Sequence, residues 1–90
     1  MGGPQLFPIY GRFVGDFVPH LVSVLTSDTM PELAEKVAVH SVGRRLPARP
    51  GGQYEVLLDG KVIPDQVTVG ELVAERRLPP LSWFDVRWRD

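Results

Sequence analysis

One stretch of this 90-residue chain, residues 33–45, has the period of an amphipathic helix, whereas the other long apolar runs have the pattern of strands. Its apolar or small residues recur three and four positions apart and so share one face: Met30, Leu33, Ala34, Val37, Ala38 and Ser41. Thr29 and Glu32 are spaced as a capping box, and Gly43 is suited to end the helix in the left-handed conformation. The stretch therefore predicts a single main helix lying across one sheet.

The other apolar runs alternate with polar residues, which is typical of strands with one buried face. They predict strands at residues 5–14, 17–26, 54–58, 61–63 and 82–88. In the second strand we expect Val18 on the core face, and Asp59-Gly60 predicts a tight hairpin between the third and fourth strands. Thr68 and Glu71 are spaced as a second capping box, which predicts a short helix up to residue 75. The first and last strands are the most apolar, so we place them side by side at the sheet centre.

The composition fits one globular domain over residues 1–90, in which residues 1–5 form a loose end. Hydrophobic residues make up 43% and charged residues 23%, which is ordinary for such a domain. A net charge of −1 gives no general attraction to nucleic acid or to an anionic membrane. There is no cysteine, no secretory signal and no apolar run of the roughly 18 residues that span a bilayer. We therefore expect a cytoplasmic protein that binds neither nucleic acid nor membrane.

The sequence contains no residue pattern that is typical of a catalytic or metal site. His20 and His40 are too few for a metal ion, which normally takes three or four converging ligands. The acidic residues near the helix starts have a structural role at the positive ends of the helix dipoles. There is neither a nucleophile elbow nor a phosphate-binding loop. We therefore predict no catalytic, cofactor-binding or metal-binding residue on this chain.

Two sequence features favour contact with another protein. Arg44, Arg45 and Arg49 form a local basic cluster in an otherwise balanced chain, which suits an acidic protein surface better than nucleic acid. A second set consists of apolar side chains that the strand and helix patterns place outward: Tyr10, Val39, Leu57, Val62 and Trp83. If these side chains formed a contiguous patch, the patch would indicate an interface.

The order of elements resembles ubiquitin. Residues 27–30 at the helix start, and residues 56–72 from the third strand through the short helix, resemble the same parts of ubiquitin. The resemblance implies an α+β fold, a ubiquitin-like β-grasp with a mixed sheet of four to five strands and one main helix packed on one face. It places Leu57 at the position of the exposed isoleucine that ubiquitin uses for recognition. Residues 87–90 read RWRD and lack ubiquitin's Gly-Gly tail, so we expect neither conjugation nor sulfur transfer.

A second and more specific resemblance is to the B protein family of the toluene monooxygenase system. It rests on residues whose spacing agrees without gaps: Phe7, Pro8, Phe13, Asp16, Phe17, Met30, Ala34, Glu35, Lys36, Val37, Ala38, His40, Arg44 and Arg45. After residue 45 the resemblance is one of topology, which leaves aromatic, alkene and isoprene oxidation open. By this resemblance the chain is the ubiquitin-like gamma subunit of a di-iron hydroxylase. It would dock on the large alpha subunit in an α2β2γ2 assembly, with the di-iron centre on the alpha subunit and no cofactor of its own.

The resulting hypothesis is a non-catalytic small subunit of a soluble di-iron monooxygenase that oxidises aromatic or alkene hydrocarbons such as toluene. The expected contacts lie at the C-terminal end and exposed face of the main helix: Lys36, Val39, His40, Arg44 and Arg45. The alternative is a free-standing ubiquitin-like interaction module without conjugation activity, which would bind its partner through Leu57 and neighbouring residues. A third class, a small enzyme in its own right, has no supporting residues in the sequence.

Overall fold

The computed structural model describes residues 3–43 and 46–89, and these form five strands and two helices. In chain order the elements are β1 (Leu6–Phe13), β2 (His20–Leu25), α1 (Met30–Ala38), β3 (Tyr54–Leu58), β4 (Lys61–Ile63), α2 (Val69–Arg76) and β5 (Trp83–Trp88). Each predicted helix and strand is present, so the α+β class is confirmed. Two of the predicted contact residues, Arg44 and Arg45, lie outside the described residues.

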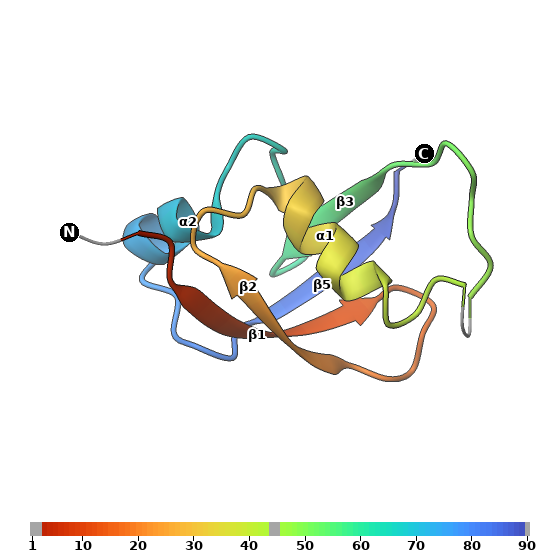
Figure 1. Ribbon diagram of the computed structural model, residues 1–90, viewed down its shortest axis with the longest axis horizontal. Helices are drawn as coiled ribbons and strands as arrows, with labels where there is room; N and C mark the ends of the chain where they lie inside the picture. Colours follow the sequence, from red (N-terminus) through yellow and green to blue (C-terminus); the bar gives the residue numbers. More distant parts are fainter. Residues whose placement is uncertain (1–2, 44–45, 90) are drawn as a thin grey trace.

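The five strands form one mixed sheet in the order β2-β1-β5-β3-β4 (Figure 1). The first and last strands lie side by side and run parallel, with Tyr10 opposite Trp83, while the other neighbouring strands are antiparallel. Pro8 fits this arrangement because its backbone faces the β5 side of β1 before the parallel ladder begins, where its carbonyl accepts from the Leu81 N–H at 2.8 Å. The predicted central pairing is therefore confirmed.

Helix α1 lies across one face of the sheet, and its buried side chains share one core with alternate residues of the strands (Figure 1). The helix approaches β1 closely at Gly11, where a Cβ atom would lie 2.5 Å from Val37 Cγ2. Glycine at this position lets α1 lie directly on the sheet. The core around the two layers contains large, fully buried side chains: Ile9, Phe13, Met30, Leu33 and Phe84.

Two carboxylates fix the start of α1. Glu32 Oε1 accepts a hydrogen bond from the Thr29 N–H at 3.0 Å, as the predicted capping box requires, and it also accepts one from the Thr29 hydroxyl at 3.0 Å. Asp28 is buried and its Oδ2 accepts from the Leu25 N–H at 2.8 Å and from Lys36 Nζ at 2.5 Å. Asp28 therefore joins the end of β2 to the second turn of the helix.

Helix α2 begins beside the start of α1. Thr68 Oγ1 accepts a hydrogen bond from the Glu71 N–H at 3.1 Å, as predicted for its cap. The Val69 N–H donates to the Asp28 carbonyl at 2.9 Å, and Thr29 and Thr68 form an isolated antiparallel bridge. Both helix starts are thus held to each other and to the end of β2.

Helix α1 is shorter than the sequence predicts. It ends at Ala38, so His40 and Ser41 lie in a turn, and the prediction of helix as far as Gly43 is wrong. The His40 N–H donates to the Val37 carbonyl at 3.2 Å and the Ser41 N–H to the Ala38 carbonyl at 2.9 Å. These bonds to the third preceding carbonyl tighten the backbone and end the α-helical pattern. Gly43 lies beyond them with a φ of +79°, the left-handed conformation expected of it.

Strand β2 begins at His20 rather than at residue 17, and the prediction that Val18 lies on the core face is wrong. Val18 is exposed, and its N–H donates to Asp16 Oδ1 at 3.2 Å, which closes a turn instead of extending a strand. Pro19 follows and has no N–H to donate to a ladder. The β1–β2 connection is therefore a turn of residues 14–19 that is longer than the predicted two-residue loop.

The packing of α1 on β1 predicts the effect of adding one methyl group. Gly11→Ala should lower the free energy of unfolding by about 1–3 kcal/mol, because the new Cβ overlaps the side chain of Val37. Val37→Ala in the same chain should restore part of that loss, so that the double variant is more stable than the sum of the two single effects predicts. Urea unfolding followed by tryptophan fluorescence measures all four proteins. Additive effects would show that Gly11 is not required for this contact.

Candidate interaction surfaces

The described residues, 3–43 and 46–89, contain no group of three or more His, Cys, Asp or Glu side chains placed to hold a metal ion. Over the same ranges, no helix has the length and apolar character needed to cross a membrane.

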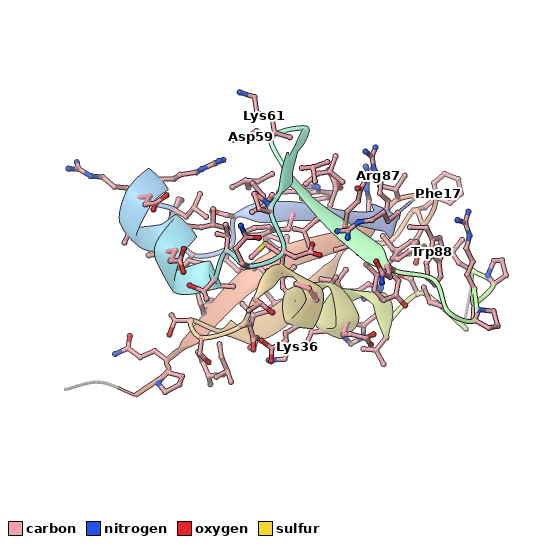
Figure 2. The ribbon with its side chains drawn as sticks, turned by 90° about the horizontal axis from the view of Figure 1, so that it is seen from above. Phe17, Lys36, Asp59, Lys61, Arg87 and Trp88 are labelled. Carbon is pink, nitrogen blue, oxygen red and sulfur yellow. The ribbon has the colours of Figure 1, made fainter. Side chains whose placement is uncertain are left out.

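The helix residues predicted as contacts differ in their environments. Lys36 Nζ forms an ion pair with the buried Asp28 carboxylate, so its charge balances that of Asp28 within the fold. Figure 2 shows the position of Lys36 on α1. Val39, directly after the helix, is 58% exposed, and His40 is half-buried. Val39 therefore exposes apolar surface, whereas Lys36 has a role within the fold.

Two contacts hold the β1–β2 turn against the end of α1. The rings of His20 and His40 stack with their centroids 4.8 Å apart and their planes 24° apart. The hydroxyl of Ser41, which is fully buried, donates to Asp16 Oδ2 at 2.6 Å. The two histidines thus form a packed pair that links β2 to the helix end. The turn and the helix end together occupy one end of the molecule (Figure 1).

The β1–β2 turn carries an exposed aromatic side chain that the sequence pattern did not predict. Phe17 is 97% exposed, and Val14 and Val18 on either side of it are 44% and 42% exposed. Figure 2 shows Phe17 at the end of the molecule where Trp88 also lies. Alternation of apolar and polar residues placed Phe17 inside a strand. The turn-forming Asp16 before it, and Pro19 after it, were the signals for the observed turn.

The face of the sheet opposite α1 is a second surface with exposed apolar side chains. Leu21, Tyr10 and Trp83 lie opposite one another on β2, β1 and β5, and they are 62%, 39% and 44% exposed. The rings of Tyr10 and Trp83 have centroids 6.4 Å apart. The predictions that Tyr10, Trp83, Val39 and Val62 point outward are confirmed.

Charged side chains on this face pair with their neighbours. Asp85 Oδ1 lies 3.3 Å from Arg12 Nε and accepts a hydrogen bond from Trp83 Nε1 at 3.0 Å. Arg87 Nε donates to Glu55 Oε2 at 2.5 Å. Such surface pairs contribute little to stability, and here they orient the side chains around Trp83.

The prediction that Leu57 is an exposed recognition residue is wrong. The side chains of Val56 and Leu58 belong to the core, so Leu57 points to the opposite face, but it is only 9% exposed. Its strand β3 has neighbours on both sides, and Leu57 lies between Asp85 of β5 and Val62 of β4. Side chains on both flanking strands surround it, which sequence alternation alone does not reveal.

A pocket of about 260 Å³ lies beside the start of α1 and is smaller than most ligand pockets. Its lining residues come from α1, β3 and the segments around them: Pro31, Glu35, Gly52, Gln53, Tyr54, Asp65 and Arg89. Arg89 donates two hydrogen bonds to Asp65, at 2.7 and 3.1 Å, and these hold the pKa of Asp65 below its usual value. Burial, with the Glu35 carboxylate as the smaller cause, raises the pKa of Tyr54. The hydrogen-bonded Asp65–Arg89 pair thus forms part of the lining of this pocket.

The sequence matches known proteins over most of its length. The family model of toluene-4-monooxygenase system protein B matches residues 6–88. The gamma subunit of the oxygenase component of the alkene monooxygenase system of Xanthobacter autotrophicus (strain ATCC BAA-1158 / Py2) is 60% identical over 86 residues, which are 94% of this chain and 98% of that protein. The gamma subunit of the hydroxylase component of the toluene-4-monooxygenase system of Ectopseudomonas mendocina is 47% identical over 45 residues, which are 50% of this chain and 54% of that protein.

Solved structures show the same fold. A chain of the toluene 4-monooxygenase HD complex with the inhibitor 4-bromobenzoate superposes with a TM-score of 0.82 at 33% identity, covering 94% of this chain and 100% of that chain. Ubiquitin of Caldiarchaeum subterraneum superposes with a TM-score of 0.66 at 20% identity, covering 96% of each chain. The second similarity concerns the fold alone, and it confirms the predicted ubiquitin-like β-grasp.

The Asp65–Arg89 pair predicts an acid response of the fold. Because the pKa of Asp65 is lower in the folded than in the unfolded chain, the pair stabilises the fold above the unfolded value and loses this effect as the pH falls through the folded value. Arg89→Gln should raise the pKa of Asp65 toward its ordinary value of about 3.9. Carbon-13 NMR titration of the carboxyl groups measures this shift, with Arg87→Gln as the control because Arg87 contacts Glu55 instead. An unchanged pKa in the Arg89 variant would rule out the pair as its cause.

Proposed function

Because this chain belongs to the toluene-4-monooxygenase system protein B family, we propose that it is the gamma subunit of the hydroxylase component of a multicomponent monooxygenase. The observation that carries the proposal is the similarity to the alkene monooxygenase gamma subunit, which extends over nearly the whole length of both chains. The proposed role is non-catalytic: the chain contributes a binding surface to an oxidoreductase complex.

The similarity favours an alkene as the hydrocarbon oxidised by the complex over an aromatic hydrocarbon such as toluene. Identity to the alkene relative is 60% over 86 residues, compared with 47% over 45 residues for the toluene relative. In this proposal the other subunits select the substrate. The sequence of the gamma subunit indicates the substrate only indirectly, because it is adapted to the hydroxylase with which the subunit assembles.

The proposed assembly is α2β2γ2 and cytoplasmic, with this chain docked on the large alpha subunit beside a beta subunit. The di-iron centre belongs to the large subunit, since such centres are held by carboxylate and histidine side chains that project into a helix bundle. The described residues of this chain provide no comparable ligand set, so we assign no step of the oxidation to it.

A free-standing interaction module is less well supported. That alternative depends on Leu57 as the contact residue, and Leu57 is buried. The neighbouring Val62 is exposed, but larger groups of exposed apolar side chains lie on the β1–β2 turn and in the row formed by Leu21, Tyr10 and Trp83. These positions suit a subunit with a large docking area better than a module with one small recognition patch.

Purification of the native complex tests the proposed function. The tagged chain should co-purify with two larger chains in equal amounts, with about two irons per large chain, as a carboxylate-bridged bundle site requires. Size-exclusion chromatography with light scattering gives the stoichiometry, and elemental analysis gives the iron. Recovery of the chain alone, or with one unrelated protein, would contradict the subunit assignment.

The basic cluster after the main helix provides a second test. The double variant Arg44→Glu, Arg45→Glu should weaken assembly, because it reverses two charges in the segment predicted to face an acidic partner. A matched control exists in Arg76 and Arg77, an exposed tandem pair at the end of α2, which lies at the opposite end of the molecule from the end of α1 (Figure 1). Equal co-purification of both double variants, with unchanged thermal unfolding, would remove the cluster from the interface.

A further inference from the structure

The β1–β2 turn, residues 14–19, carries a phenylalanine whose side chain is exposed, in contrast to the buried phenylalanines of the strands. Phe17 is 97% exposed, whereas Phe13 and Phe84 are 1% and 0% exposed. Figure 2 shows Phe17 at the tip of the turn, directed away from the body of the molecule. Its ring makes no contribution to the core, so the fold does not account for an aromatic residue at this position.

The backbone that leads into the turn is held by the sheet. The Val14 N–H donates to the Val86 carbonyl of β5 at 2.8 Å, and the Asp16 N–H donates to the Phe13 carbonyl at 2.9 Å. Gly15 lies between them with a φ of +102°, which L side chains rarely adopt. The position of the chain immediately before Phe17 is therefore fixed.

The side chain of Asp16 fixes the turn from the inside. It is 6% exposed, and its carboxylate accepts from the Val18 N–H at 3.2 Å and from the buried Ser41 hydroxyl at 2.6 Å. The first bond closes the turn around Phe17, and the second attaches the turn to the segment after α1. A binding loop that is already ordered loses little conformational entropy when it meets a partner.

The sequence near the Phe17 turn has an excess of basic residues. A Cβ atom on Gly15 would lie 3.9 Å from Leu46 Cδ2, so the turn lies close to Leu46. In the sequence, residues 14–20 and 39–53 contain three arginines, and their single acidic residue is the buried Asp16. Phe17, Val14 and Val18 thus form an exposed apolar tip in a basic setting.

We propose that Phe17 is a preformed anchor that inserts into an apolar socket with an acidic rim on the large subunit of the hydroxylase. The proposal rests on the proposed function, because it names the surface through which the gamma subunit docks. Aromatic side chains at the centre of an interface commonly contribute most of the binding free energy. The Asp16–Ser41 bond attaches the turn to the segment that begins with the exposed Val39, so the anchor and the end of α1 lie at one end of the molecule (Figure 1).

A second copy of this chain is a poorer occupant than an acidic partner. In a symmetric dimer built through the same turn, the basic segments of both copies would face each other, which disfavours association. An unrelated acidic subunit meets no such repulsion. The observed charges therefore favour a heterologous partner.

Phe17→Ala tests the anchor, with Leu6→Ala as the matched control. Both side chains are exposed and apolar, but Leu6 lies at the opposite end of β1 and is 72% exposed. Titration of each variant into hydroxylase purified without its gamma subunit should give a Kd about 30-fold or more above that of the unaltered chain for Phe17→Ala. Leu6→Ala should stay within about twofold. Thermal unfolding of both variants should match that of the unaltered chain.

Ser41→Ala tests the positioning of the anchor by Asp16. The variant should weaken docking in a chain that contains Phe17, and it should have little further effect when combined with Phe17→Ala, because the anchor it positions is then absent. Independent, additive losses would assign Ser41 a purely structural role.

The affinity for the hydroxylase should fall with increasing salt in the unaltered chain and in Phe17→Ala alike, since both retain the basic residues.

The outcomes separate the two proposals. If the unaltered chain does not bind the hydroxylase, the subunit assignment fails. If the unaltered chain binds and Phe17→Ala binds equally well, the anchor is overturned while the subunit assignment stands. If the isolated chain is a dimer that Phe17→Ala converts to monomers, the occupant is a second copy, and the proposed docking on the large subunit is overturned.

Discussion

The close contact between Val37 and Gly11 determines how α1 lies on the sheet, and the other surfaces of the molecule depend on that placement. With no side chain at residue 11, the helix covers the core directly above β1. A chain of this size forms one small core, and α1 is the longer of the two helices that pack on it. The opposite face of the sheet is left with Tyr10 and Trp83 exposed. Because α1 covers one face of the sheet, the opposite face keeps exposed apolar side chains that a partner could cover.

Two buried carboxylates fix the ends of this arrangement. Asp28 joins the end of β2 to α1, and Asp16 joins the turn that precedes β2 to the residues after α1. A carboxylate is costly to bury unless hydrogen bonds satisfy it, and both groups have such bonds. Together they align β2 with the helix at both ends. The exposed turn is consequently part of the rigid body, although it contributes nothing to the core.

Local sequence patterns predicted the parts of the fold that local chemistry decides. The capping residues Thr29 and Thr68, the Asp59-Gly60 hairpin and the alternation in β1 and β5 all gave the correct elements. Some of the errors occur where a distant residue intervenes. The segment after α1 is held by the bond between Ser41 and Asp16, and the burial of Leu57 depends on strands that flank it in space. The exposure of Phe17 has a different, local origin, because Asp16 closes a turn with the Val18 N–H and Pro19 has no N–H to donate to a ladder.

The position of β5 determines when the sheet can close during folding. β5 is the third of five strands in the sheet but the last to be synthesised, and it pairs with β1 across more than seventy residues of chain. The sheet therefore cannot close while β5 is still inside the ribosome, and pairing over such a separation is intrinsically slow. The Val14 N–H, which shapes the Phe17 turn, also waits for its acceptor on β5. The turn that presents Phe17 is consequently completed only when β5 has paired with β1, so its shape depends on closure of the whole sheet.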